Sequence, residues 1–154
     1  MIKYFTYSIS ITFISWIIGM IINAFLVKTE LYRTNLSNLN FIKSRFINKA
    51  IGVTLIKWVV KNTFFKYFNP KLSIKNQPKL SELDNLRKEM TIAEVSHLIA
   101  FFAVIIFAVV TFFKGKHLLA LVMTIINILM NLYPSLLQQE NKRRIDKLIA
   151  FFQK

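Results

Sequence analysis

Glu94 and His97 are the two residues of this chain whose type and spacing best fit acid–base chemistry. They stand three residues apart at the start of a long apolar run, so that a helix would place both on one face. Ionisable side chains in such a run are costly to bury in a membrane and are therefore functional candidates. We take His97 and Glu94 as candidate catalytic residues, with the histidine as proton acceptor and the carboxylate orienting its ring. The alternative is a neutralised pair that only links two helices.

A second set of polar residues recurs at steps of 4, 3, 4 and 3 residues: Asn127, Asn131, Pro134, Gln138 and Asn141. At about 100° per residue, this spacing confines them to a stripe about 80° wide on one helix. Asn131, Gln138 and Asn141, with Arg144 just beyond them, are candidate substrate-binding residues. Pro134 has a structural role, because it donates no amide hydrogen and leaves the carbonyl near Met130 free.

The two polar sets are predicted to lie at one depth. The apolar runs that contain them are joined by the turn Lys114–Lys116, and so short a connection requires antiparallel neighbours. Counted from Gly115, Glu94 and His97 are about 21 and 18 residues away, and Asn131 and Gln138 are about 16 and 23, each with the same rise. A carboxylate, an imidazole and two amides should therefore meet near one membrane interface.

Metal and nucleotide chemistry are not expected. The Glu-x-x-His spacing also occurs in carboxylate-bridged metal bundles, but those contain it twice with further glutamates, and this chain has it once. The chain has no cysteine to supply a thiolate. The motifs of nucleotide-binding loops, serine hydrolases and zinc proteases are absent from the sequence. We expect no metal and no cofactor.

The elements that must position these residues are transmembrane helices. With 55% hydrophobic residues in 154, and only 3 Gly and 3 Pro, the composition predicts an all-α integral membrane protein with a single domain, 1–154. Spans are expected at about 4–27, 92–113 and 117–137, each near the length needed to cross a bilayer. The first is expected to be a retained anchor and not a cleaved signal peptide.

Charge predicts the orientation of these spans. The net charge is +14, and the basic residues flank the apolar runs instead of interrupting them, which is typical of membrane topology and not of nucleic-acid binding. The loop 28–91 and the tail 138–154 are both basic. We therefore expect a multi-pass protein of the cell membrane, with its N-terminus outside and its C-terminus in the cytoplasm.

The basic loop contains an amphipathic segment, 42–68, in which lysines alternate with large apolar residues. Lys49, Lys57 and Lys61 share one helical face, which favours an interfacial helix whose lysines reach the headgroups. A fourth span would bury Lys57 and Lys61 at about 2.5 to 3.5 kcal/mol each, so we reject it.

Two segments of the chain resemble a known family. AEVSH at 93–97 and NLYPSLLQQENKRR at 131–144 are similar to the glycosyl-4,4′-diaponeurosporenoate acyltransferases of staphyloxanthin-type carotenoid synthesis. That family shows Glu-x-x-His, then Asn shortly before Pro, then Gln and an Asn-Arg-x-Arg end. The chain departs from it where Gln-Arg-Tyr-Asn-Arg is common, and reads Gln138, Gln139, Glu140, Asn141, Lys142 instead.

The resemblance implies transfer of a fatty acyl group to a hydroxyl of a glycosylated isoprenoid or glycolipid at the cytoplasmic interface. In that chemistry His97 would take the hydroxyl proton, with Glu94 orienting its ring. Asn131 and Gln138 would donate hydrogen bonds to the oxyanion, and Arg144 would hold an anionic acyl carrier. An acyl donor such as acyl-CoA would then be a co-substrate, and membrane lipids and the isoprenoid would be the partners.

The sequence leaves open whether the site is catalytic. A non-catalytic membrane subunit or lipid-binding partner would use the same polar face for assembly, either with another protein or with a second copy of itself. A third interpretation is a lipid-flux module without chemistry, in which the segment 42–68 is the working part. No nucleic acid is expected as a partner.

Overall fold

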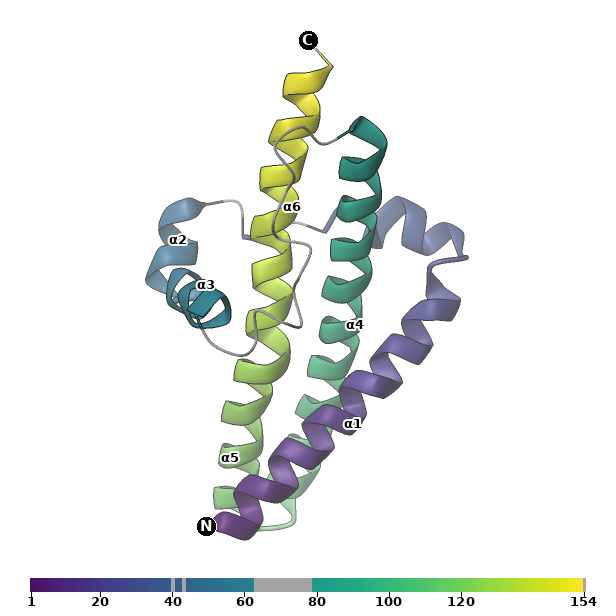
Figure 1. Cartoon of the computed structure of the whole chain (residues 1–154). Coiled ribbons are helices and arrows are strands. Elements are labelled where there is room, and N and C mark those ends of the chain that lie inside the picture. The colour runs from purple at the N-terminus through teal and green to yellow at the C-terminus, as the bar shows by residue number, and fades with distance from the viewer. Residues whose placement is uncertain (40, 43, 63–78, 154) are drawn as a thin grey trace.

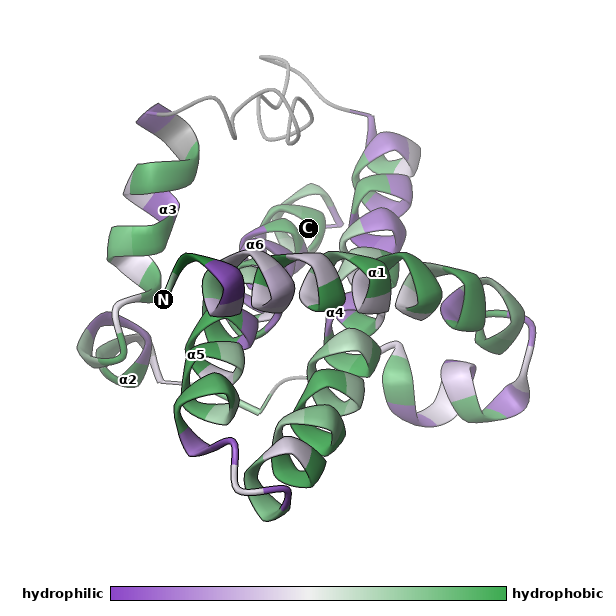
Figure 2. Ribbon diagram, turned by 90° about the horizontal axis from the view of Figure 1, so that it is seen from below, coloured by the Kyte–Doolittle hydropathy of each residue, from purple (hydrophilic) through white to green (hydrophobic). Residues whose placement is uncertain are grey.

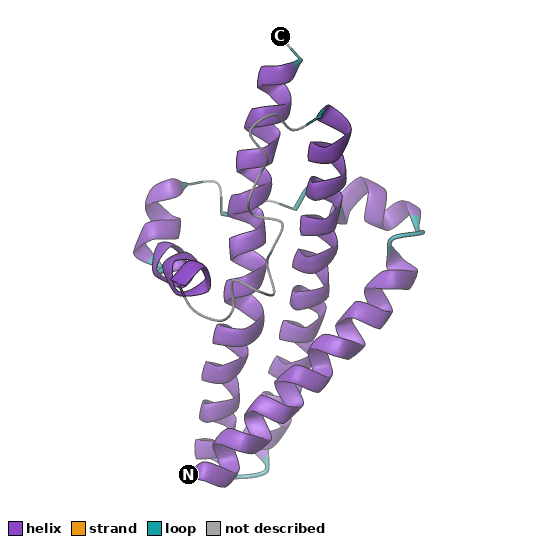
Figure 3. Cartoon of the chain, in the orientation of Figure 1, coloured by secondary structure: helices purple, strands orange, loops and turns teal. Residues whose placement is uncertain are grey.

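The computed structural model describes residues 1–39, 41–42, 44–62 and 79–153, without the side chains of Arg45 and Lys61. Within these ranges every regular element is helical (Figure 3). Along the chain these elements are α1 (Ile2–Leu26), η1 (Tyr32–Leu36), α2 (Arg45–Ala50), α3 (Val53–Asn62), α4 (Leu80–Phe113), α5 (His117–Asn127), η4 (Ile128–Leu132) and α6 (Tyr133–Phe152). The two η elements are π-helical turns.

Three long helical segments dominate the molecule (Figure 1). They are Ile2–Leu26, Leu80–Phe113 and the continuous segment His117–Phe152, and each is long and apolar enough to cross a membrane. The prediction of an all-α architecture with about three spans is confirmed, and this architecture is that of a membrane protein. In Figure 2, hydrophobic residues predominate along α1 and α5, and hydrophilic residues gather in the first turns of α4.

Two of the three helices extend past the spans expected from hydropathy. The second begins at Leu80 instead of Ile92, and the third continues to Phe152 instead of ending near Leu137. Beyond the apolar runs these helices pack on each other through Leu83, Met90 and Ile145. Hydropathy indicates which residues lie in the bilayer, but it does not indicate where a helix ends. Here side-chain packing stabilises the helices beyond the apolar runs.

The amphipathic segment 42–68 is not one helix. It forms α2 and α3, with a break at Gly52, whose φ of 80° belongs to the left-handed region that favours glycine. Residues 63–68 lie outside the described part of the chain. The two short helices pack beside α6, where Lys57 Nζ lies 2.7 Å from Glu140 Oε1 and Tyr133 donates a 2.7 Å hydrogen bond to the Ile51 carbonyl. Lys57 therefore pairs with a carboxylate within the protein instead of reaching toward headgroups.

The first helix crosses the other two on a stripe of small and polar residues: Ser8, Thr12, Ser15, Gly19 and Asn23. All are buried, while the apolar residues on the remaining faces of α1 are largely exposed. Asn23 Nδ2 donates to the Ile92 carbonyl at 2.8 Å and to Ser96 Oγ at 3.0 Å. Small residues allow backbones to approach closely, which is the usual basis of helix association in lipid.

Gly19→Ala is expected to loosen this contact. An added Cβ would lie 2.5 Å from the Ser96 carbonyl oxygen, a backbone atom that cannot move aside. Alanine favours the helix by about 1 kcal/mol, but overpacking costs about 1 to 3 kcal/mol, so we expect a net loss and a lower midpoint of thermal unfolding in micelles. Ile21→Ala, at an exposed site on the same helix, is the control. A midpoint for Gly19→Ala equal to or above that of wild type would contradict the close approach.

Candidate active site

His97 is held between α1 and the third helix. Its ring stacks on Trp16 of α1, with centroids 5.6 Å apart and the planes inclined by 16°. Its Nδ1 lies 3.2 Å from Asn131 Oδ1 on η4. The side chain is partly exposed. A ring over an indole face is also well placed to be stabilised when it becomes a cation.

A chain of two amides decides which nitrogen of His97 carries the proton. Asn127 Nδ2 donates to the Phe101 carbonyl at 3.0 Å, and a backbone carbonyl can only accept. Asn127 Oδ1 therefore accepts from Asn131 Nδ2 at 2.9 Å, which leaves Asn131 Oδ1 as the acceptor from His97 Nδ1–H. In the neutral ring Nε2 is then an unprotonated acceptor, the state required of a general base.

Glu94 lies one turn from His97 and has different partners. The carboxylate is fully buried; Gln139 donates to its Oε1 at 2.7 Å, and the nearly buried Lys142 ammonium forms an ion pair with its Oε2. Lys142 also donates to the Leu39 carbonyl at 3.2 Å. Among the described contacts the ring of His97 is oriented by Asn131, and not by Glu94 as we had expected. The Glu94 and Lys142 pair instead joins α4, α6 and the segment before α2.

The π-helical turn η4 explains why Gln139 faces Glu94 in place of Gln138. A π turn holds one residue more than an α turn, so the side chains that follow are set back by about one position, or about 100°. The buried stripe therefore continues from Asn131 through Ser135, Gln139 and Lys142. Pro134 is the second residue after this turn. It cannot donate to the Met130 carbonyl and its ring crowds that carbonyl, which accounts for the widening.

The residues expected from the sequence are thus only partly brought together. Glu94, His97 and Asn131 share one buried region. Gln138 is half-buried, and Asn141 is buried with no hydrogen-bond partner for its amide among the described residues. Arg144 is exposed on α6.

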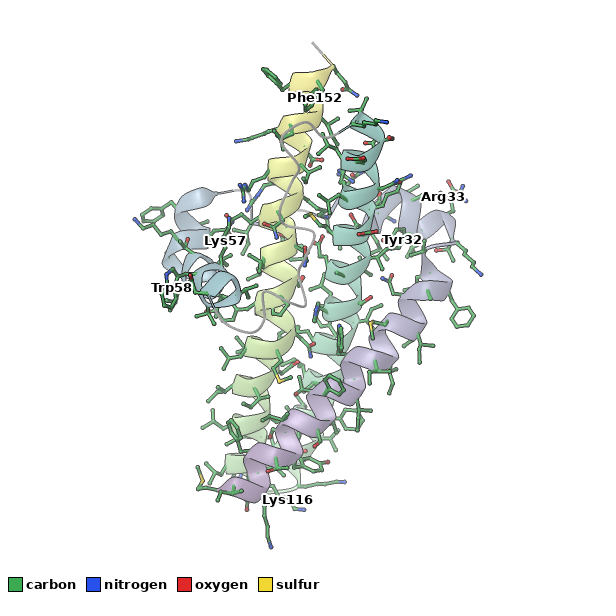
Figure 4. All side chains as sticks on the ribbon, in the orientation of Figure 1. Tyr32, Arg33, Lys57, Trp58, Lys116 and Phe152 are labelled. Carbon is green, nitrogen blue, oxygen red and sulfur yellow. The ribbon has the colours of Figure 1, made fainter. Side chains whose placement is uncertain are left out.

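Tyr32 is a site residue that sequence reasoning missed. It is 7% exposed and lies on η1 close to α4 (Figure 4). Burial raises the pKa of its phenol, and the negative charge of nearby Glu94 raises it further. The phenol is therefore a neutral donor at physiological pH, and its oxygen has no partner among the described residues. No helical period links Tyr32 to the later spans, so the sequence carries no signal for it.

Metal ligation is not suggested by the side chains that the structure describes. Among them, no group of three or more His, Cys, Asp or Glu is placed to hold a metal ion. The chemistry that the arrangement itself supports is proton transfer at His97 Nε2, beside buried amide and hydroxyl donors.

Comparison with known proteins identifies a family for the chain. The family model described as glycosyl-4,4′-diaponeurosporenoate acyltransferase matches residues 28–151. The chain belongs to this family. Membership supports an acyltransferase-like role in carotenoid modification. The matched range contains Glu94, His97, Asn131 and Lys142, whereas Trp16 lies before it. No curated protein and no solved structure matches the chain significantly.

Proposed function

We propose that the protein transfers a fatty acyl group to a sugar hydroxyl of a glycosylated isoprenoid or a related glycolipid. One observation carries this proposal: the Asn127 and Asn131 amides leave His97 Nε2 as a proton acceptor at a partly exposed position. Membership in the acyltransferase family supplies the reaction class. An acceptor with an apolar tail in the bilayer places its sugar near the headgroup level, where the extended ends of α4 and α6 begin.

The proposed reaction is a direct transfer. His97 Nε2 takes the proton of the acceptor hydroxyl while its oxygen attacks the carbonyl carbon of an acyl thioester such as acyl-CoA. The tetrahedral intermediate collapses with cleavage of the carbon–sulfur bond, and the imidazolium returns the proton to the leaving thiolate. Trp16, stacked on the ring at 5.6 Å, stabilises the transient imidazolium. Atoms and charge balance without a covalent enzyme intermediate.

The remaining polar residues have supporting parts in this proposal. The buried Ser135 hydroxyl, which has no partner among the described residues, is suited to donate to the oxyanion. The Asn131 amide, which we had expected in that role, is held between Asn127 and His97 Nδ1 and instead fixes the proton on the ring. Gln139, and not Gln138 as we had expected, is the glutamine of α6 that faces the site, where it donates to Glu94. Glu94 acts as a positioning residue through Lys142. Arg144 is exposed on α6, beyond Lys142 along the chain, and is suited to bind the phosphates of an acyl carrier.

The topology in this proposal follows from charge. The basic segments 28–91 and 138–154 lie in the cytoplasm and the N-terminus lies outside the cell membrane. On α2 and α3, Phe46, Leu55 and Trp58 are exposed, as Figure 4 shows for Trp58. These side chains are suited to enter the cytoplasmic interface beside the site.

A second candidate function is supported by the buried ion pair. Glu94 and Lys142, with Gln139, tie α4 to α6, and such a network is also what a non-catalytic membrane subunit or lipid-binding protein needs to hold its helices. In this alternative the exposed apolar faces of the spans receive a partner protein or a second copy of the chain.

An acyl-transfer assay separates the two functions. The purified protein, in lipid nanodiscs, is supplied with a glycosyl ester of diaponeurosporenoate and a deuterated fatty acyl thioester. We expect a product whose mass equals that of the acceptor plus the labelled acyl group, detected by liquid chromatography with mass spectrometry. Diaponeurosporenoate without its sugar offers no sugar hydroxyl and should give no product. A folded protein that acylates no glycosylated acceptor would favour the non-catalytic function.

A further inference from the structure

A pocket of about 400 Å³ lies at the end of the bundle remote from His97. It is formed where the first turns of α1 meet the turn between α4 and α5, and Figure 4 shows Lys116 at this end, beside the start of α1. His97 is about 18 residues back along α4, or about 27 Å at the rise of a helix. The pocket is therefore a separate feature from the candidate active site.

Three lysines from two parts of the chain line this pocket: Lys3, Lys114 and Lys116. None of their ammonium groups has an ion-pair partner among the described residues. The seven acidic residues of the chain are Glu30, Glu82, Asp84, Glu89, Glu94, Glu140 and Asp146. None of these belongs to the segments that form the pocket, so its charge is positive and uncompensated.

Backbone geometry brings the lysines together. Gly115 has a φ of 74°, which allows the tight turn that places Lys114 and Lys116 on either side of it. Tyr4 and Tyr7 add phenols to the wall, and neither phenol has a hydrogen-bond partner in the described ranges. Ammonium groups and phenolic hydroxyls together are donors suited to phosphate oxygens.

The surroundings of the pocket favour a lipid over a soluble anion. Exposed apolar residues are next to its lining residues in the sequence, namely Phe5, Phe113 and Leu118 at 53%, 82% and 48% exposure. We propose that the pocket binds the phosphate of an anionic phospholipid whose acyl chains lie against these residues. Lysines that only anchor a span reach separately into the headgroup layer, whereas here they line one pocket.

The bound lipid joins α1 to the turn between α4 and α5. Lys3 belongs to α1, while Lys114 and Lys116 flank the turn, so one phosphate neutralises charges that would otherwise repel each other across this junction. Since α1 also carries Trp16, the lipid supports the packing of α1 without taking part in the chemistry at His97.

Lipid retention tests this inference. Wild type and the variant Lys3→Gln/Lys114→Gln/Lys116→Gln are purified from the same mixed phosphatidylglycerol and phosphatidylcholine membranes, washed in mild detergent and examined by native mass spectrometry. The control Lys28→Gln/Lys88→Gln/Lys147→Gln has the same net charge and changes exposed lysines elsewhere. We expect wild type and the control to retain one phosphatidylglycerol, and the pocket variant to lose it by about tenfold or more.

Two results would overturn the proposal. Equal retention by the pocket variant and the control would show that the lysines contribute only diffuse charge. Inorganic phosphate that raises the midpoint of thermal unfolding as much as phosphatidylglycerol does would show a site for a free anion and not for a lipid. A wild-type preference for phosphatidylglycerol over phosphatidylcholine, lost only in the pocket variant, supports it.

Discussion

Replacement of His97 by glutamine is expected to reduce acyl transfer by about 10²- to 10⁴-fold, which is the usual contribution of a positioned general base. Glutamine can still pair with Asn131, so the fold should be kept, but it has no atom that accepts a proton near neutral pH. The initial rate of product formation in nanodiscs measures the effect, and the midpoint of thermal unfolding is recorded on the same preparation. His117→Gln changes the other histidine of the chain, which is exposed beside the turn after α4, and is the matched control.

A variant with a smaller expected loss of activity tests the role of Asn131. Asn131→Leu removes the acceptor that selects the Nδ1–H form of His97, so we expect a smaller loss than for His97→Gln, because part of the population still has Nε2 free. Equal rates for His97→Gln and His117→Gln, both folded, would rule out general-base catalysis by His97. Such a result would leave the assembly function as the explanation of this polar region.

Glu94→Gln is expected to have the largest effect on stability, about 3 to 5 kcal/mol, because removal of one partner leaves the other charge buried and unpaired. In this variant Lys142 would still donate to the Leu39 carbonyl at 3.2 Å, but its ammonium would have lost the Glu94 carboxylate. The free energy of unfolding, measured by denaturant titration in micelles, records the loss. Glu140→Gln is the control, since it breaks the partly exposed pair with Lys57 and should cost less than about 1 kcal/mol.

The double variant Glu94→Gln/Lys142→Gln shows what the pair does. With both charges removed, most of the lost stability should return, and the two single effects should be far from additive. We expect acyl transfer to return with it, because Glu94 positions the helices and does not touch the acceptor. A stable double variant without activity would instead make Glu94 a direct participant in the reaction. A Glu94→Gln variant as stable as wild type would show that the buried pair does not form.

Several features of the site could be read from the chain because they depend on local order along it. The three-residue spacing of Glu94 and His97 on one face needs only a helix. The short turn at Gly115 makes the two spans that it joins antiparallel, which brings His97 and Asn131 to one depth. Such statements follow from helix period and rise, and these hold in any protein.

The register beyond Asn131 could not be read in this way. A count at 3.6 residues per turn put Gln138 on the inner face, whereas η4 holds an extra residue and brings Gln139 and Lys142 there instead. The proline was visible in the sequence, but a proline can kink, end or widen a helix. Which of these occurs depends on the packing of the neighbouring helices.

The polar pair at the start of the second apolar span is thus a feature that the sequence by itself determined, together with the three helices and the family pattern around Glu94 and His97. Tertiary structure alone decided the partners of that pair. Trp16 and Asn131 hold the histidine, while Lys142 and Gln139 hold the carboxylate. The physical reason is that periodicity determines which residues share one face of a helix, but not which faces come into contact. That contact depends on how closely small residues such as Gly19 let the helices approach. It also depends on where a π turn shifts the register of the residues that follow.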